Sequence, residues 1–368
     1  MRLIQILLLC LWLVSIPVYA QLIPPLPSTG SMNWGNWSFE WEIGDENKEG
    51  LVIKNVRWNG TKILHKGSLP VIRVKYRGDS SSLGDGCGPY RDRIHEGNIS
   101  FLPGQLTPVI GRVFDDQIFE IAIFAEIGGY DIYQAWYFHK SGRLEPVVYS
   151  SGWSCDKDGN EDGHGLDHKH HPYWRLDFDV EGNSNEVWRI RTKNNNSVEV
   201  FKYPEEWNSW KLADDKSIAW TINKPGSNSH VLIRAPSNEL RDEGGSPWFH
   251  FSSKDMGVRR YHSSEDEGWI FDWDEHLGYK NPEWLPGEDV NGKDIVFWAV
   301  GHLSHQWTQA DEDNPEWHST GLTIDVVSRT AEILQLTQMP LHYTERELKR
   351  RSNNIHAKIL QLIQMPLR

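Results

Sequence analysis

Three histidines stand within four positions in the stretch GLDHKHHPYWRLDFDVEG, residues 165–182. Polar and apolar side chains alternate directly behind them, which is the period of a half-buried strand. If that strand includes the histidines, His168 and His170 share one face, while Lys169 and His171 point the other way. Two neighbouring imidazoles on a strand can bind copper, zinc or nickel. A solvated histidine-rich loop is the competing interpretation.

Two other segments carry side chains that could join such a site. Tyr130 follows two glycines in EIGGYD, and glycine permits backbone angles that give close access to the ring. The run DIVFWAVGHLSHQ places His302 and His305 at the end of an apolar, strand-like segment. Each segment alone is weak evidence, because a packed strand tyrosine or a bystander histidine would look the same.

The elements that must position these residues are strands. From residue 34 to about 327, short segments rich in Val, Ile, Trp, Tyr and Phe alternate with turn signals such as Asn-Gly, Ser-Gly and Asp-Gly. No long amphipathic helical pattern interrupts them. The sequence therefore predicts a mainly β protein, a large antiparallel β-sandwich over residues 34–330.

The two ends of the chain have a different character. Residues 1–20 combine one basic residue, an apolar run and a small-residue end, which predicts a secretory signal peptide. No later apolar run reaches the length of a membrane span, so we expect a secreted or periplasmic protein that is free of the membrane after signal cleavage. The proline, serine and glycine residues of segment 21–33 predict an extended leader. Residues 331–368 form a tail in which ILQLTQMPLH recurs as ILQLIQMPLR.

Net charge and cysteine content indicate which partners and which cysteine state to expect. The net charge is −13 and no basic cluster precedes the tail, which argues against a nucleic-acid partner. Signal cleavage would remove Cys10 and leave Cys87 and Cys155. One disulfide is the simplest state of two cysteines in an exported protein, and a free pair is the alternative.

The nineteen tryptophans suggest another class, a carbohydrate-binding sandwich that stacks sugars on exposed rings. Many of them, however, lie within strand-like runs, where burial is the commoner explanation. We take core packing as the default for most of them.

The histidine stretch, Tyr130 and the downstream run occur in an order that resembles the catalytic domain of topaquinone-dependent copper amine oxidases. The resemblance begins with WSFEWEIGDENKEGLVIKNVRWNGTKIL at residues 37–64 and continues through VKYRGD at residues 74–79. It extends to about residue 327, and the chain looks like a shortened, diverged member of that family. The resemblance implies a β-sandwich enzyme that converts primary amines, O₂ and water to aldehydes, ammonia and hydrogen peroxide. It also implies a homodimer.

Carried over residue by residue, the resemblance implies metal ligands. His168 and His170 match the first two Cu(II) ligands, and counting from Asp294 favours His305 over His302 as the third. Asp177 and Asp179 match carboxylates that bind a second, structural cation, for which calcium suits the hard oxygen ligands. An ordinary solvated strand face is the equally weighted alternative for these two aspartates.

Tyr130 matches the tyrosine that the family converts to topaquinone, and Tyr76 matches the tyrosine that contacts the quinone oxygen. The family has Asn where this chain has Gly129, directly before the modified tyrosine. The segment that carries the family's general base is compressed here to GDSSSLGDGCGPYRDRI, in which Asp85 and Asp92 are the candidates. We assign the role of the base to Asp85. A copper-binding protein of the same fold without oxidase activity is therefore the same-fold alternative.

Overall fold

β-Strands form nearly all the regular structure of this computed structural model, because β-branched and aromatic residues fill short runs between glycine- and asparagine-containing turns. The structure describes residues 21–22, 25–44, 48–76, 88, 90–101, 105–152, 167–212, 214–227, 229–235, 254–263, 273–274, 279–280, 287–306 and 316–327. None of these segments is a helix long and apolar enough to cross a membrane.

The first sheet has twelve strands among the described residues, and its neighbouring strands are antiparallel. Its order is β1 (Gln21–Leu22), β8 (Ile110–Phe114), β9 (Ile118–Ile127), β10 (Tyr130–His139), β11 (Arg143–Gly152), β24 (Thr323–Val327), β17 (His230–Arg234), β16 (Asp215–Asn223), β13 (Glu186–Lys193) and β14 (Val198–Lys202), with β7 (Ile99–Ser100) beside β9 and β23 (His318–Gly321) beside β11.

The second sheet has ten strands among the described residues and is also antiparallel. Its order is β15 (Trp207–Ser209), β18 (Met256–Arg260), β21 (Ile295–Val300), β12 (His168–Phe178), β5 (Thr61–Tyr76), β4 (Gly50–Trp58), β3 (Trp37–Gly44) and β2 (Thr29–Trp34), with β22 (Leu303–His305) beside β12 and β6 (Tyr90–Asp92) beside β5. A short 3-10 helix, Glu96–Asn98, and a two-stranded ribbon, β19 (Trp273–Asp274) and β20 (Tyr279–Lys280), complete the elements.

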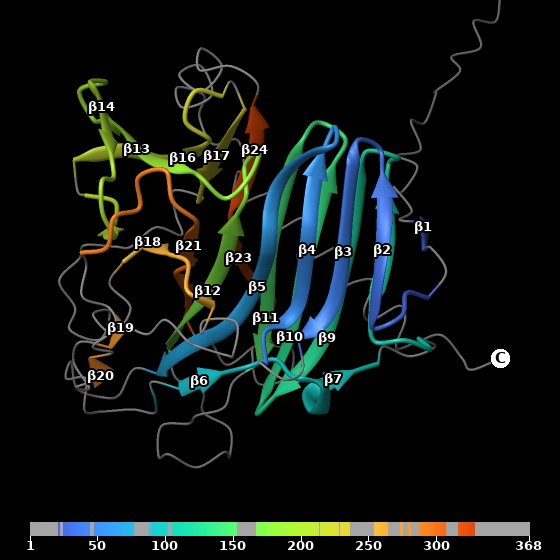
Figure 1. Ribbon diagram of the computed structural model, residues 1–368. Helices are drawn as coiled ribbons and strands as arrows, with labels where there is room; N and C mark the ends of the chain where they lie inside the picture. The colour runs from blue at the N-terminus through green and yellow to red at the C-terminus, as the bar shows by residue number, and fades with distance from the viewer. Residues whose placement is uncertain are drawn as a thin grey trace, which may run out of the picture.

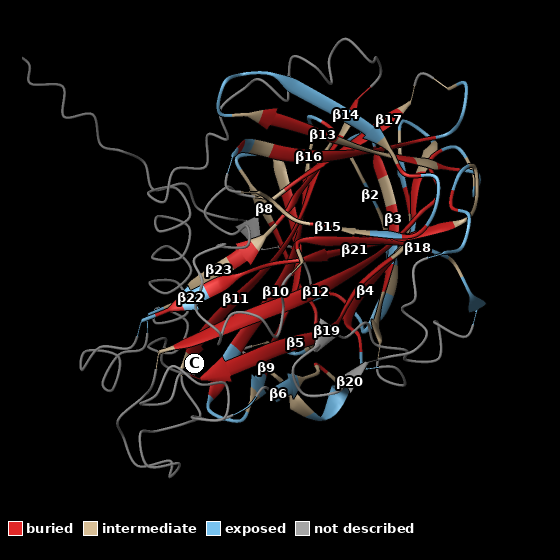
Figure 2. Cartoon of the chain, turned by 90° about the vertical axis from the view of Figure 1, so that its left-hand side faces the viewer, coloured by how far each residue is buried: buried red, intermediate tan, exposed pale blue. Residues whose placement is uncertain are grey.

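The two sheets lie face to face, with β2 to β5 across β9 to β11 (Figure 1). The predicted β-sandwich is therefore confirmed. One continuous apolar core lies between the sheets, and strands β12 and β21 of the second sheet are buried along their whole length (Figure 2). Within the segment expected to be an extended leader, residues 21–33, β2 begins at Thr29 and pairs with β3.

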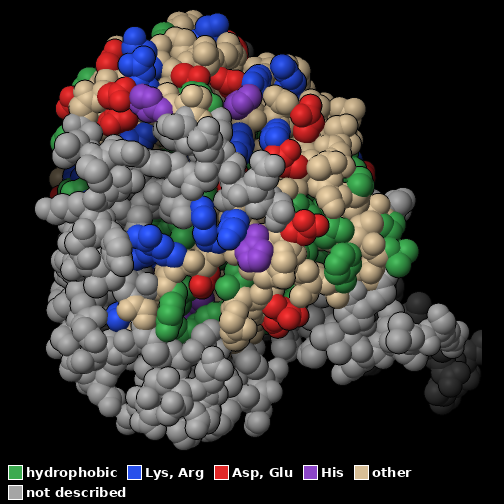
Figure 3. Space-filling view, turned by 60° about the horizontal axis from the view of Figure 1, so that its bottom comes forward, with side chains coloured by type: hydrophobic (Ala, Val, Ile, Leu, Met, Phe, Trp, Pro, Cys, Tyr) green, Lys and Arg blue, Asp and Glu red, His purple; other side chains and the backbone are tan. Residues whose placement is uncertain are grey.

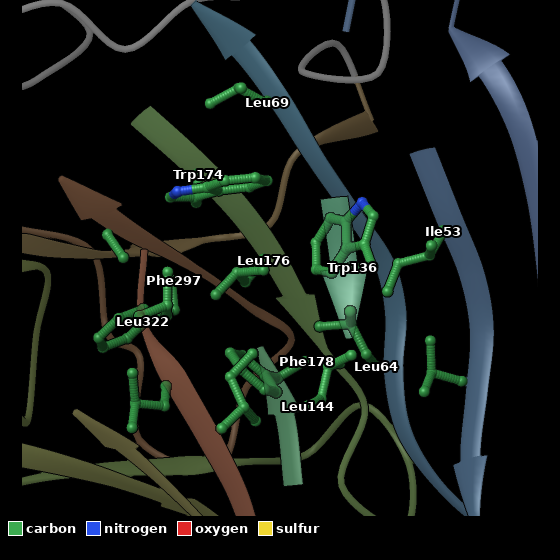
Figure 4. Packing of buried hydrophobic residues seen from close by; sticks show 14 of the residues in the cluster. Ile53, Leu64, Leu69, Trp136, Leu144, Trp174, Leu176, Phe178, Phe297 and Leu322 are labelled. Atoms are coloured by element: carbon green, nitrogen blue, oxygen red, sulfur yellow. The ribbon is translucent and has the colours of Figure 1, made fainter. Parts of the chain in front are cut away.

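Aromatic side chains from both sheets fill the centre of the core. The Trp136 ring of β10 meets the Trp174 ring of β12 edge to face, with centroids 5.2 Å apart, and the leucine and phenylalanine side chains below them extend the contact (Figure 4). Such aromatic pairs contribute about 0.5–1.5 kcal/mol beyond the area they bury.

Polar contacts fix the position of one sheet on the other. The Gln134 amide on β10 accepts a hydrogen bond from Leu51 N at 2.9 Å and donates to Leu51 O at 3.0 Å, and the Trp136 indole donates to the same carbonyl at 3.0 Å. Buried, paired bonds of this kind contribute about 1 kcal/mol each and, more importantly, allow a single arrangement of the two sheets.

Candidate metal centre and active site

The candidate site lies at one end of the sandwich, where β5 ends beside β6 at the bottom of Figure 1. Tyr76, His168 and His305 stand directly opposite one another on three neighbouring strands, β5, β12 and β22. Paired residues of an antiparallel sheet point to the same face, and Tyr76 belongs to the core between the sheets. The row therefore faces the first sheet. Histidine, basic and acidic side chains gather on the surface at this end (Figure 3).

His168 and His170 share the inner face of β12, as the alternation in the sequence predicts, and both are buried. Their ring centroids are 4.9 Å apart, and those of His168 and His305 are 4.7 Å apart. His305 Nδ1 lies 3.2 Å from His168 Nε2. Two nitrogens that bind one ion at about 2.0 Å with roughly tetrahedral angles stand about 3.3 Å apart, so this pair fits a shared metal ion.

The third imidazole is suited to ligation by its protonation state. Burial, followed by the neighbouring His168, lowers the pKa of His170 well below its usual value, so the ring is neutral at neutral pH. Its Nδ1 atom is buried and has no hydrogen-bond partner. A neutral imidazole with a buried, unused nitrogen is what a transition metal requires of a ligand. Among the described residues, no group of three or more His, Cys, Asp and Glu side chains is already arranged to hold a metal ion.

Tyr130 begins β10 directly after a two-residue turn, since Ile127 and Tyr130 pair across Gly128 and Gly129. Gly128 has φ +59°, which glycine adopts without strain. On the other side, the backbone of Gly152 approaches so closely that a Cβ there would stand 2.1 Å from the Gly129 carbonyl oxygen. Glycines thus bring three backbone segments together around the tyrosine.

The buried ring of Tyr130 faces the histidines across the gap between the sheets. The centroid of the Tyr130 ring lies 4.8 Å from that of His170 and 5.6 Å from that of His168. The Tyr130 ring is buried and stands nearly perpendicular to the His170 ring. The Tyr130 hydroxyl is hydrogen-bonded to that of Tyr76. Burial, followed by Tyr76, raises the pKa of Tyr130 well above 10, so the phenol stays protonated in the metal-free protein.

Among the described residues, Asp92 is an acidic residue whose charge acts on Tyr130. It stands opposite Ile72 on the edge strand β6, and Ile72 packs in the inner core. Burial raises the Asp92 pKa to about 6, although Arg73 opposes the rise. The charge of Asp92 in turn adds to the raised pKa of Tyr130. Asp85, to which we assigned the role of general base, lies outside the described residues. Cys87 and Cys155, the two cysteines of the expected disulfide, also lie outside them.

His302 lies apart from the metal candidates. Its Nδ1 atom is 2.8 Å from Nδ1 of His171, and its Nε2 atom is 2.9 Å from Asp255 Oδ1. His171 belongs to the face of β12 that points away from the core, as the alternation predicts. The sequence left His302 and His305 as competing ligands, and the structure brings only His305 to His168.

The second cation site, expected at Asp177 and Asp179, has a lysine beside one of its carboxylates. Asp177 and Asp179 are both buried, but the Lys62 ammonium forms an ion pair with Asp179, and His65 Nδ1 lies 3.9 Å from the same carboxylate. Burial, followed by the charge of Asp179, raises the pKa of Asp294. Lys62 therefore forms an ion pair with Asp179 at the place where calcium was expected, and the assignment of Asp177 and Asp179 to a cation stays a prediction.

His318 is a residue at the site that the sequence reasoning missed. Its ring centroid lies 4.0 Å from that of His305. A single histidine in EWHSTG has no partner at a metal-ligand spacing, so only the pairing of β23 with β11 brings it here.

The tryptophans are consistent with core packing. Of those whose side chains are described, only Trp207 is exposed, with 45% of its surface accessible. Five are fully buried: Trp37, Trp136, Trp174, Trp220 and Trp298. The described part of the chain therefore offers no row of exposed rings on which a sugar could stack.

No protein-family model matches the chain, and no curated protein matches it in sequence. Solved structures do match its fold. Lysyl oxidase from Pichia pastoris aligns with a TM-score of 0.59 at 14% identity, over 81% of this chain and 52% of that one. A copper-containing benzylamine oxidase from Hansenula polymorpha gives 0.56 at 17% identity, over 83% and 62%. An amine oxidase from Aspergillus nidulans gives 0.53 at 14% identity, over 90% and 55%. The chain thus spans little more than half the length of these oxidases, and the likeness establishes the shared fold.

Proposed function

We propose that this chain, which has the fold of copper-containing amine oxidases, is an exported copper-dependent primary-amine oxidase. The reaction is amine plus O₂ plus water to aldehyde, ammonia and hydrogen peroxide. Tyr130 is the proposed precursor of a topaquinone. The observation that carries the proposal is the position of the Tyr130 ring against His168 and His170, with His305 Nδ1 3.2 Å from His168 Nε2.

In this proposal His168, His170 and His305 hold the copper. Copper bound there would supply Lewis-acid and redox chemistry next to the Tyr130 ring, and the quinone would supply an electrophilic carbonyl for the amine. Burial of the three imidazoles keeps water away and keeps at least His170 neutral, which lowers the cost of binding a dication.

The remaining roles belong to residues around Tyr130. The Tyr76 hydroxyl, bonded to that of Tyr130, orients the ring from the opposite sheet. Asp92, in place of Asp85, is the proposed general base that takes a proton from the substrate carbon next to the amine nitrogen. A carboxylate with a pKa of about 6 is ionised at neutral pH and yet a stronger base than an exposed aspartate.

Gly129 supports a second candidate, a copper-binding protein of the same fold without oxidase activity. Glycine has no side chain with which to hold the neighbouring ring of Tyr130 in one orientation. The same copper site would then exist without turnover, and small primary amines and O₂ would not be consumed.

Phenylhydrazine separates the two functions. The purified protein is loaded with Cu(II) in air and phenylhydrazine is added, and we expect a strongly coloured adduct because hydrazines react with quinone carbonyls. Tyr130→Phe removes the hydroxyl and serves as the control that must stay colourless. A copper-loaded wild-type protein that also stays colourless would leave the copper-binding function alone standing.

A further inference from the structure

His318 comes to the site from the sheet opposite the other histidines. It stands directly across from Ser150 on β11, and Ser150 stands across from Ile132 on β10. Paired residues share a face, and Ile132 belongs to the core between the sheets. His318 therefore points toward the second sheet. Its position across the sheet from Ile132 is two residues along β10 from Tyr130, and Tyr130 pairs with Gly152.

The contact of His318 is with His305. The two ring centroids are 4.0 Å apart with an interplanar angle of 41°, closer than His305 is to His168 at 4.7 Å. His318 is half-buried, whereas His305 is buried beneath it.

His305 needs support of this kind because its own strand is short. β22 has three residues, Leu303–His305, and His305 is the last of them. One side of β22 pairs with β12, which fixes the backbone of His305 opposite His168. The orientation of the ring, which decides whether Nδ1 faces His168 Nε2, depends on what packs against the ring itself.

We propose that His318 is a positioning residue for the metal centre. Its ring packs on His305 from the opposite sheet and holds Nδ1 of His305 toward His168, and it does so by packing rather than by donating a nitrogen. This inference rests on the proposed copper site, but it does not depend on oxidase activity. It also makes the metal centre a junction of the two sheets, so the geometry at the metal depends on how they pack.

The test compares His318→Ala, which removes the ring, with His318→Phe, which keeps an aromatic ring but no nitrogen. Each full-length variant is titrated with Cu(II) against a competing chelator, and the electron paramagnetic resonance spectrum of the bound Cu(II) is recorded. His318→Ala should bind Cu(II) about tenfold more weakly with altered copper hyperfine splitting, since loss of a residue that orients a ligand typically costs 10–100-fold in affinity. His318→Phe should resemble the wild type in both measurements.

His262→Ala is the matched control, because it removes a half-exposed imidazole bonded to Glu288 at 2.9 Å. It should change neither measurement. Unchanged affinity or an unchanged spectrum in His318→Ala would overturn the inference, and so would a His318→Phe variant as impaired as His318→Ala, which would make His318 a direct ligand. A wild-type protein that binds copper in this manner but forms no quinone would contradict the proposed oxidase function alone.

Discussion

Replacing both His168 and His170 with alanine is expected to weaken Cu(II) binding more than a hundredfold. The two imidazoles are adjacent on the inner face of β12, and the substitution leaves His305 as the only one of the three proposed ligands. Since the loss of a residue that merely orients a ligand costs about 10–100-fold, the loss of two ligands costs more. Competition with a chelator of known affinity gives the dissociation constants.

His171→Ala provides the matched control for that double variant. It removes a buried imidazole from the same strand, but from the opposite face, where His171 contacts His302. Copper affinity should remain within a few-fold of the wild type. Tight copper binding that survives in the double variant and is lost in His171→Ala would move the metal site to the other face of β12.

Asp92→Asn is expected to lower amine turnover by a factor of about 10² to 10⁴, the usual effect of removing a general base. Copper affinity should not change, because Asp92 lies on β6 and not among the histidines. In the wild type, kcat/KM should rise as the pH increases through about 6, where Asp92 loses its proton, and the residual activity of the variant should lack that rise. Peroxide production from a simple primary amine, measured across pH, gives both results.

Unfolding would not explain a loss of turnover in Asp92→Asn. The folded-state pKa of about 6 exceeds the ordinary 3.8, so the unfolded chain releases this proton more readily and stability falls as the pH rises from about 4 to above 6. Asparagine removes that penalty, which is at most about 3 kcal/mol. The variant should therefore be at least as stable as the wild type at pH 7. Full turnover in the variant would return the role of the base to Asp85.

Local periodicity explains why much of the site was predictable. Alternation with period two placed His168 and His170 on one face and His171 on the other, and the structure has the same arrangement. The fold class followed in the same way from short β-branched and aromatic runs between turns.

Long-range pairing explains what the sequence could not predict. His318 reaches His305 only because β23 pairs with β11 across an interval of more than 150 residues. Asp92 approaches Tyr130 only because β6 adds to the edge of β5. His302, expected to be a competing ligand or a bystander, instead joins a buried contact with His171 and Asp255, which depends on the position of β18. No spacing within a single segment encodes these contacts.

Peptide mass spectrometry across Tyr130 shows whether copper and O₂ modify this ring. The protein is incubated with Cu(II) in air and digested, and the peptide that contains Tyr130 is compared with that of a copper-free sample and of the His168→Ala/His170→Ala variant. We predict that oxygen is added to the Tyr130 ring only when copper and both histidines are present. An unmodified Tyr130 after prolonged aerobic incubation of the copper-loaded wild type would contradict the proposed conversion of Tyr130 to a quinone.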